Sequence, residues 1–237
     1  MIFELLLAFA AFAGGVVASI AGFGVGSIIT PLLATKLGMK VAVAAVAIPH
    51  VIATALRFWA LRDKLDRHVM WTFGVTSAIG GLLGALLHIW IASRALSYLL
   101  AALLIFTGIT GLLGITLKFG KKTAWAAGGL SGMLGGLVGN QGGIRAGAML
   151  GFEVPKEAFV ATSTAVGLFI DGMRLPVYLY SEGDALLKIW PLIAIATVAV
   201  TIGTLLGRRI LGRISDDAFK RVVSVLILGL GISMLFV

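Results

Sequence analysis

Gly22-Phe23-Gly24-Val25-Gly26-Ser27 and Gly139-Asn140-Gln141-Gly142-Gly143-Ile144-Arg145 are two glycine-rich stretches, and each of them interrupts a long apolar run. Lipid cannot hydrogen-bond a freed backbone amide, so non-helical backbone at membrane depth must be buried in protein or line a wet cavity. Two such breaks at matching places in the two halves of one chain point to a transporter's substrate site. The second break carries an arginine, which favours an anion as the substrate.

The composition is that of a membrane protein. The chain is 59% hydrophobic and 12% charged, whereas soluble domains are about 25% charged. Its 19 lysines and arginines outnumber its 10 acidic residues. Most of these basic residues lie in short loops between apolar runs, which indicates orientation in a membrane rather than nucleic-acid binding. The chain contains no cysteine, which excludes disulfides and thiolate metal sites.

Apolar segments long enough to cross a bilayer, about 20 residues each, fill both halves of the chain. We predict a first transmembrane repeat at residues 1–117, a basic linker at 118–123 and a second repeat at 124–237. Each half has one broken element followed by three plain helices, at 3–37, 41–61, 69–92 and 95–117 in the first half and at 124–152, 158–180, 186–207 and 218–237 in the second.

The two halves also resemble each other residue by residue. The run Lys40–Ala47 aligns with Lys156–Ser163 at a constant offset of 116. An ordered series of such matches is evidence of duplication. The same offset pairs Gly26 with Gly142, Asp66 with Glu182 and, within one residue, Arg57 with Arg174, while Ala95 and Gly108 recur in the last helix as Ala218 and Gly231.

The placement of basic residues separates parallel from inverted repeats. If each broken element is a re-entrant hairpin, the repeats are inverted, and 12 basic residues fall on one side of the membrane against 4 on the other. If each broken element crosses the membrane, the repeats run parallel and the split is nearly even. The positive-inside rule favours the first arrangement, with both termini outside and the linker in the cytoplasm. We therefore expect an all-α polytopic membrane protein with two inverted repeats, each a re-entrant helical hairpin plus three transmembrane helices.

Arg145 is the leading candidate for substrate binding. An ionised arginine deep in a bilayer costs at least ~2.5–3.5 kcal/mol on insertion scales, so it needs a polar interior and a partner. One interpretation is a snorkelling arginine or a structural ion pair. The functional interpretation is an anion clamp, because the planar guanidinium suits an oxyanion and nearby amides add donors. These neighbours are Asn140, Gln141, Gly142 and Gly143, with Gly24, Gly26, Ser27 and Thr30 as the facing wall from the first break.

The glycines of the first break have a second interpretation, since small residues commonly serve only close packing of helices. In the second half, Asp171 and Arg174 lie three residues apart on one helical face, where they can form an ion pair. Asp171 is alternatively a proton carrier that partners Arg145. Thr162 and Ser163 begin a run of three hydroxyl residues that cannot all face one site, so some must bond their own backbone.

Two residues of the first half complete the candidates for coupling or gating. His50 follows Pro49 in the middle of an apolar segment and is either a satisfied structural residue or a proton carrier. Arg57 lies near the basic end of the same segment, close enough to snorkel to the interface. His88 lies at a segment end, where we expect it to meet the interface as well.

Common enzyme signatures are absent from the sequence, which has no helical His-Glu-x-x-His, no Gly-x-Ser-x-Gly and no phosphate loop. The sequence therefore predicts a protein that is not an enzyme, with no catalytic residue, no cofactor and no metal site.

The chain resembles the TauE/SafE family of membrane transporters. The resemblance rests on Gly-Phe-Gly-Val-Gly-Ser-x-x-x-Pro-Leu-Leu ending at Leu33, on its counterpart around Gly139 to Gly147, and on Lys-x-Ala-x-x-Ala-Thr-Ser ending at Ser163. It implies passage of a small sulfur-containing or organic anion, such as sulfite or a sulfonate, by export driven by an ion gradient. Family members specialised for thiosulfate rely on cysteines, so the absence of cysteine argues against that branch.

The combined prediction is a secondary transporter of the inner (plasma) membrane that works by alternating access around a midplane anion site, with H⁺ as the coupling ion. Two other functions stay open, a passive anion channel and an accessory membrane protein that transports nothing. The sequence also leaves open whether the chain forms a homo-oligomer.

Overall fold

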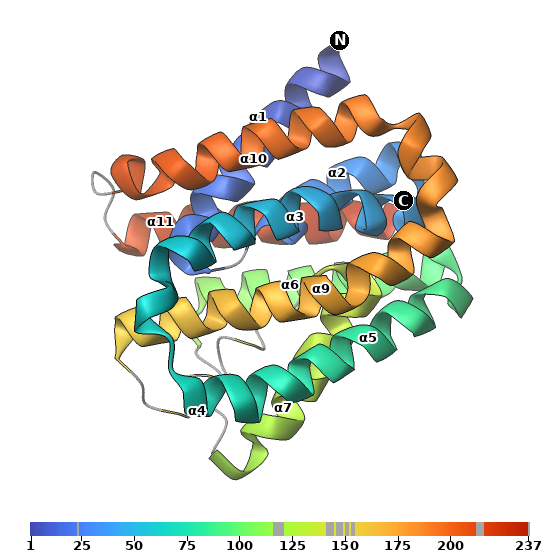
Figure 1. Ribbon diagram of the computed structural model, residues 1–237. Helices are drawn as coiled ribbons and strands as arrows, with labels where there is room; N and C mark the ends of the chain where they lie inside the picture. The colour runs from blue at the N-terminus through green and yellow to red at the C-terminus, as the bar shows by residue number, and fades with distance from the viewer. Residues whose placement is uncertain are drawn as a thin grey trace.

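The computed structural model describes residues 1–22, 24–115, 121–140, 145, 149, 152, 155–211 and 216–236. These residues form helices and no strand, which confirms the all-α prediction. The main helices in Figure 1 are α1 (Ile2–Ala21), α2 (Val25–Leu37), α3 (Met39–Leu61), α4 (Arg67–Val69), α5 (Val75–Trp90), α6 (Ser93–Leu112), α7 (Lys121–Val138), α9 (Lys156–Lys188), α10 (Trp190–Leu211) and α11 (Asp216–Ser233).

Six helical stretches among the described residues are long and apolar enough to cross a membrane. α4 and α5 join through a π-helical turn at Met70–Gly74 and count as one stretch. Length and composition thus agree with a multi-pass membrane protein. The six stretches are Ile2–Ser19, Met39–Lys64, Arg67–Trp90, Ser93–Leu112, Glu157–Lys188 and Trp190–Gly207.

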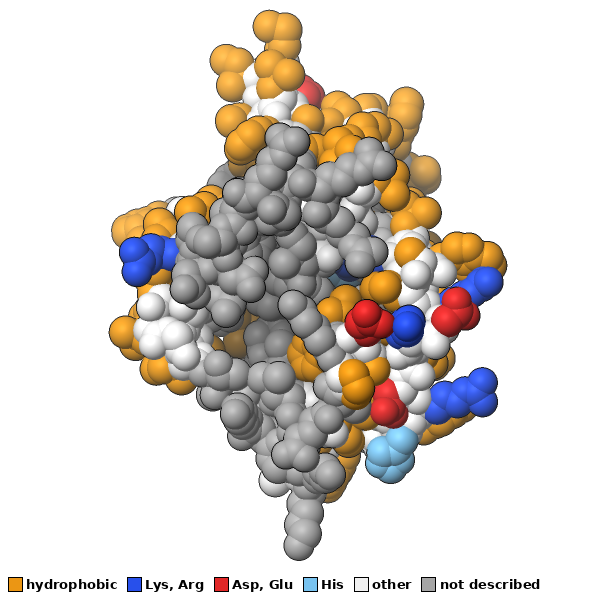
Figure 2. All heavy atoms as spheres, turned by 90° about the vertical axis from the view of Figure 1, so that its left-hand side faces the viewer, with side chains coloured by type: hydrophobic (Ala, Val, Ile, Leu, Met, Phe, Trp, Pro, Cys, Tyr) orange, Lys and Arg blue, Asp and Glu red, His pale blue; other side chains and the backbone are white. Residues whose placement is uncertain are grey.

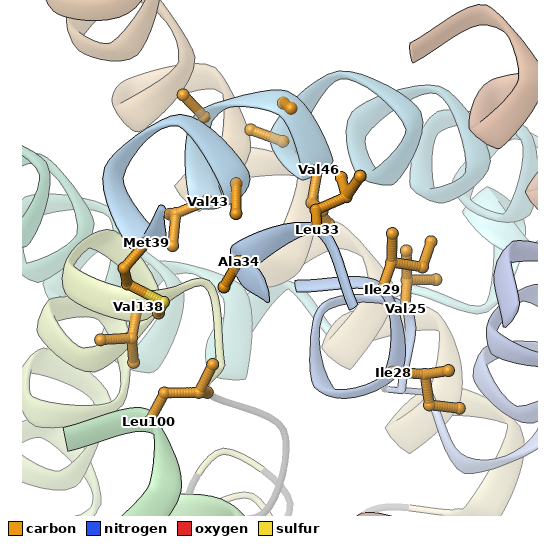
Figure 3. Packing of buried hydrophobic residues seen from close by; sticks show 14 of the residues in the cluster. Val25, Ile28, Ile29, Leu33, Ala34, Met39, Val43, Val46, Leu100 and Val138 are labelled. Carbon is orange, nitrogen blue, oxygen red and sulfur yellow. The ribbon is translucent and has the colours of Figure 1, made fainter. Parts of the chain in front are cut away.

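α2 differs from these helices because it is short and buried. Its 13 residues correspond to about 20 Å at ~1.5 Å per residue, less than the ~30 Å of a hydrocarbon core. Figure 3 shows its side chains Ile29 and Leu33 in a cluster with Val46 of α3, Leu100 of α6 and Val138 of α7. A short helix enclosed by its own protein has the dimensions expected of the inner arm of a re-entrant hairpin.

A glycine in the left-handed backbone region closes the helix before each break. Gly22 has a φ of 75° and donates its N–H to the Ala18 carbonyl at 3.1 Å. Gly139 has a φ of 72° and donates its N–H to the Gly135 carbonyl at 2.9 Å. Glycine takes this conformation at little cost and is the usual residue just past a helix C-terminus. Both apolar runs therefore stop for the same local reason.

The helices of the first half pack against helices of the second half. α1 packs along α10 and α5 along α7, while α6 packs on α11 and α3 on α9. α6 and α11 run antiparallel, because Ile105 adjoins Gly231 whereas Gly111 adjoins Ser224. α3 and α9 are antiparallel too, running right to left and left to right in Figure 1. Parallel repeats would align corresponding helices in the same direction, so this packing favours the predicted inversion.

Small residues let these helices approach closely. A Cβ added at Gly132 of α7 would collide with the carbonyl oxygen of Ser77 on α5, and one added at Gly203 of α10 would collide with that of Phe12 on α1. Close backbone approach through glycine is a usual way for helices to associate in lipid, where no hydrophobic force drives them together. Most glycines outside the breaks thus allow close helix packing and do not belong to the candidate site.

Charged side chains gather at the end of the bundle where α3 leads into α4 and α9 begins. Lys64 and Glu157 are both exposed there and form an ion pair at 3.2 Å. Asp66 caps α4 by accepting the Val69 N–H at 3.0 Å. Figure 2 faces this end and shows blue and red side chains beside orange hydrophobic flanks. The sequence assigns this end to the cytoplasm.

Candidate functional site

The polar residues of the bundle interior form stripes on two helices. α3 and α9 pack together, and each repeats polar or small residues at spacings of three and four, which places them on one helical face. The α3 stripe is His50, Thr54 and Arg57, and the α9 stripe is Ser163, Gly167, Asp171, Arg174 and Tyr178.

Asp171 lies at the centre of these stripes and has two partners. Its Oδ1 accepts from Arg174, whose Nε lies at 3.0 Å and Nη2 at 2.8 Å, which confirms the predicted ion pair. Its Oδ2 lies 2.6 Å from His50 Nδ1. His50 is therefore paired with a carboxylate that lies 121 positions away, a contact that no sequence pattern indicated. A carboxylate beside an imidazole can pass a proton between the two groups.

Three side chains bind the last carbonyls of α7, just before the second break. Arg174 Nη1 donates to the Gly135 carbonyl at 2.7 Å, and the Tyr178 hydroxyl donates to that of Gly136. His88 Nδ1 lies 2.7 Å from the Leu137 carbonyl oxygen, which accepts its proton. The last carbonyls of a helix lack partners inside the helix, and that of Gly135 also accepts the Gly139 N–H. These side chains therefore help to fix where α7 ends.

The prediction that His88 meets the interface is wrong, because its side chain is fully buried against the ring of Tyr178. Tyr178 was missed as well. Its spacing of four residues from Arg174 was the available signal, since residues four apart share a helical face. His88 had no comparable signal in its own segment.

The two breaks touch each other. A Cβ added at Gly26 would collide with the carbonyl oxygen of Gly139, and one added at Gly139 would lie 3.8 Å from Thr30 Oγ1. Thr30 Oγ1 and Asn140 Nδ2 are buried and have no hydrogen-bond partner among the described residues. Ser27 is buried on the same helix. Residues more than 100 positions apart are thus in contact, as the duplicated pattern predicted.

Arg145 lies against the first break. Its side chain is buried, and Nη2 donates to the Gly22 carbonyl at 3.0 Å. Nε and Nη1 have no partner in the described part of the chain. A Cβ added at Gly167 of α9 would lie only 2.9 Å from Nη1, so this glycine makes room for the guanidinium. Buried donors without acceptors are rare and call for an explanation.

Arg57 is half-buried and bonds back along its own helix. Its Nη2 donates to Thr54 Oγ1 at 3.0 Å, while Nε and Nη1 are buried without a partner among the residues the structure describes. Thr54 Oγ1 also lies 3.5 Å from His50 Nδ1. Thr54, which the sequence did not single out, therefore connects Arg57 to the pair formed by His50 and Asp171.

The three consecutive hydroxyl residues of α9 do not share one site, as expected. Thr162 Oγ1 accepts the N–H of Asp66 at 2.9 Å, and Thr164 donates to its own helix at the Val160 carbonyl at 2.7 Å. A Cβ added at Gly22 would lie 3.8 Å from Ser163 Oγ. Ser163 thus lies near the first break, whereas Thr162 holds the turn after α3.

Gly24 begins α2 with a φ of 133°, which restricts this position to glycine. A Cβ there would also collide with Val17 at 2.6 Å. Its role in the described structure is to let the chain turn back. Three predicted substrate-binding residues, Gln141, Gly142 and Gly143, lie outside the described residues.

A family model described as "Sulfite exporter TauE/SafE" matches residues 7–234, nearly the whole chain. No curated protein and no solved structure matches it. The family is one of transporters, which points away from an enzyme, and together with the apolar helices it supports a multi-pass membrane transporter of sulfur-related anions. The expectation drawn from the two glycine-rich motifs is therefore confirmed, and the chain belongs to the TauE/SafE sulfite exporter family.

Proposed function

We propose that this protein is a secondary transporter that exports a small anion, sulfite or a sulfonate first among the candidates, from a site between the two breaks. The observation that carries the proposal is Arg145, which is buried with two guanidinium nitrogens that have no partner among the described residues. A cation in that position is stabilised when an anion occupies the space beside it.

The neighbours of Arg145 support binding of an oxyanion. Thr30 Oγ1 and Asn140 Nδ2 are further polar atoms without a described partner, at the contact between the breaks. The hydrogen bonds of Asp171 among the described residues go to Arg174 and His50, and no hydrogen bond or ion pair among them joins it to Arg145. A bound anion would supply acceptors to donors that have none among the described residues.

Contact between the breaks suggests how the site could open to either side. Gly26 and Gly139 meet with no space for a side chain, and they belong to different halves of the chain. In transporters built from inverted repeats, one repeat rocks against the other around a site at their interface. We propose the same alternating access here.

Counterflow in proteoliposomes tests this proposal. Vesicles loaded with unlabelled sulfite should accumulate labelled sulfite transiently, and the initial rate should saturate. A passive channel would conduct without counterflow, and an accessory protein would neither bind nor move the anion. Either result would remove the transporter assignment.

We further propose that H⁺ is the coupling ion and that the pair of Asp171 and His50 carries it. Asp171→Asn should retain anion binding and lose the dependence of flux on the pH gradient, since the amide does not titrate. His50→Gln is a second variant that leaves the ion pair with Arg174 intact. Flux that still follows the pH gradient in both variants would leave Asp171 as a purely structural partner of Arg174.

We propose that both termini face outside the cell and that the charged end of the bundle is cytoplasmic. Single cysteines on this cysteine-free chain report the topology. An impermeant maleimide should label Arg94→Cys on intact cells and Lys64→Cys only after permeabilisation, as both positions are exposed. Labelling of Lys64→Cys from outside would contradict the assignment.

A further inference from the structure

The second cation near the first break, Arg57, has no role in the site described so far. Its Nε and Nη1 are buried without a partner in the described chain, and only Nη2 is bonded, to Thr54. Removing a guanidinium from water is costly unless a charge or acceptor replaces the water. Arg57 as a whole is half-buried, whereas Arg145 is buried, but both have Nε and Nη1 enclosed without a described partner, and they come from different halves of the protein.

Arg57 and Arg145 approach the same place. A Cβ added at Gly167 would lie 2.9 Å from Arg145 Nη1 and 3.6 Å from the methyl of Thr54, the residue that holds Arg57. Arg145 and the Thr54 side chain that holds Arg57 thus lie on either side of Gly167. Two positive charges face the same part of the interior, where like charges repel more strongly than in water.

Comparison of the two halves shows that Arg57 lacks the acidic residue that its counterpart has three positions earlier. Arg57 corresponds within one residue to Arg174, and Arg174 is neutralised by Asp171 three positions earlier. Three positions before Arg57 the chain has Thr54, which carries no charge. One arginine of the related pair is thus part of a structural ion pair, and the other forms no ion pair with a carboxylate in the part of the chain that the structure describes.

We propose that Arg57 and Arg145 together bind the transported anion and that the pair selects anions with two negative charges. This inference rests on the proposed anion site and adds its charge selectivity. A pyramidal oxyanion such as the sulfite dianion offers three oxygens, enough to accept from both guanidinium forks. A sulfonate has the same three oxygens and one charge fewer, so it leaves one arginine uncompensated.

Binding of two anions to the purified full-length protein tests this inference. The probes are sulfite at mildly alkaline pH, where the dianion dominates, and methanesulfonate, a monoanion with a similar oxygen face. Wild-type protein should bind sulfite about tenfold or more tightly than methanesulfonate. Arg57→Gln should weaken sulfite binding by roughly ten- to a hundredfold, the range for a charged hydrogen bond, and methanesulfonate binding by less.

The matched control is Arg62→Gln, which removes an exposed basic residue that stacks on Trp59 at the end of α3. It should change neither affinity. Arg57→Lys keeps the charge, so it should lose affinity for both probes and retain the preference for the dianion. This variant decides the matter if Arg57→Gln does not fold.

The outcomes distinguish failure of the two-arginine site from failure of the proposed anion transport. If wild-type protein binds both anions and Arg57→Gln leaves the ratio of their affinities unchanged, the two-arginine site is refuted while the site at Arg145 stands. Where Arg57→Gln does not fold, Arg57→Lys refutes the two-arginine site by binding both anions as tightly as the wild-type protein does. If wild-type protein binds neither anion, the proposed anion transport fails with it.

Discussion

Replacing Arg145 by alanine is expected to weaken anion binding by roughly one to two decades. Loss of hydrogen bonds to a charged group is typically worth about 1.5–3 kcal/mol. Arg145 Nη2 is already bonded to the Gly22 carbonyl, so the contribution to the ligand comes from Nε and Nη1, which have no described partner. Arg145→Lys keeps the charge and loses the planar fork, and it should weaken binding less than alanine does.

Isothermal titration with sulfite on protein in detergent measures these affinities. Arg94→Ala is the matched control, because Arg94 is an exposed arginine that donates to Tyr98 far from the breaks. Gly167→Ala provides an independent check, since its Cβ would press on Arg145 Nη1 and should weaken binding without removing a charge. Wild-type affinity in a folded Arg145→Ala protein would refute the site.

Replacing Asp171 by alanine is expected to lower the free energy of unfolding by about 3–5 kcal/mol, the usual effect of removing one partner of a buried ion pair. Asp171 has no exposed side-chain surface, and Arg174 has 2%. The substitution leaves the Arg174 charge enclosed without a carboxylate and leaves His50 without its partner. It also loosens the residue that donates to the Gly135 carbonyl at the end of α7.

Reversible unfolding in mixed micelles gives this free energy. Glu157→Ala is the control, because Glu157 pairs with Lys64 on the exposed surface and such pairs contribute at most about 1 kcal/mol. Equal losses for the two variants would mean that Asp171 and Arg174 do not form a tight pair in the folded protein. The coupling test uses Asp171→Asn instead, since its amide oxygen can still accept from Arg174.

The class of protein and the ends of the helices before the two breaks could be predicted from the order of residues alone. Gly22 and Gly139 end their helices through a left-handed backbone conformation that depends on the residue itself and on the turn before it. The pairing of Asp171 with Arg174 was equally accessible, because three residues along a helix is a fixed distance. Apolar length likewise predicted five of the six described stretches that are long enough to cross a membrane. The sixth, Ile2–Ser19, was expected to belong to a re-entrant hairpin, and the last helix of the chain is not among the six.

The partners of the buried polar groups, in contrast, depend on how the helices pack. His50 and Asp171 are 121 positions apart, and Arg145 and Gly22 are 123 apart. His88, at the end of a segment, is enclosed by α7 and α9 instead of meeting the interface. The reason is that a helix fixes the face on which a side chain lies, whereas the packing of helices from both halves decides which other face it contacts.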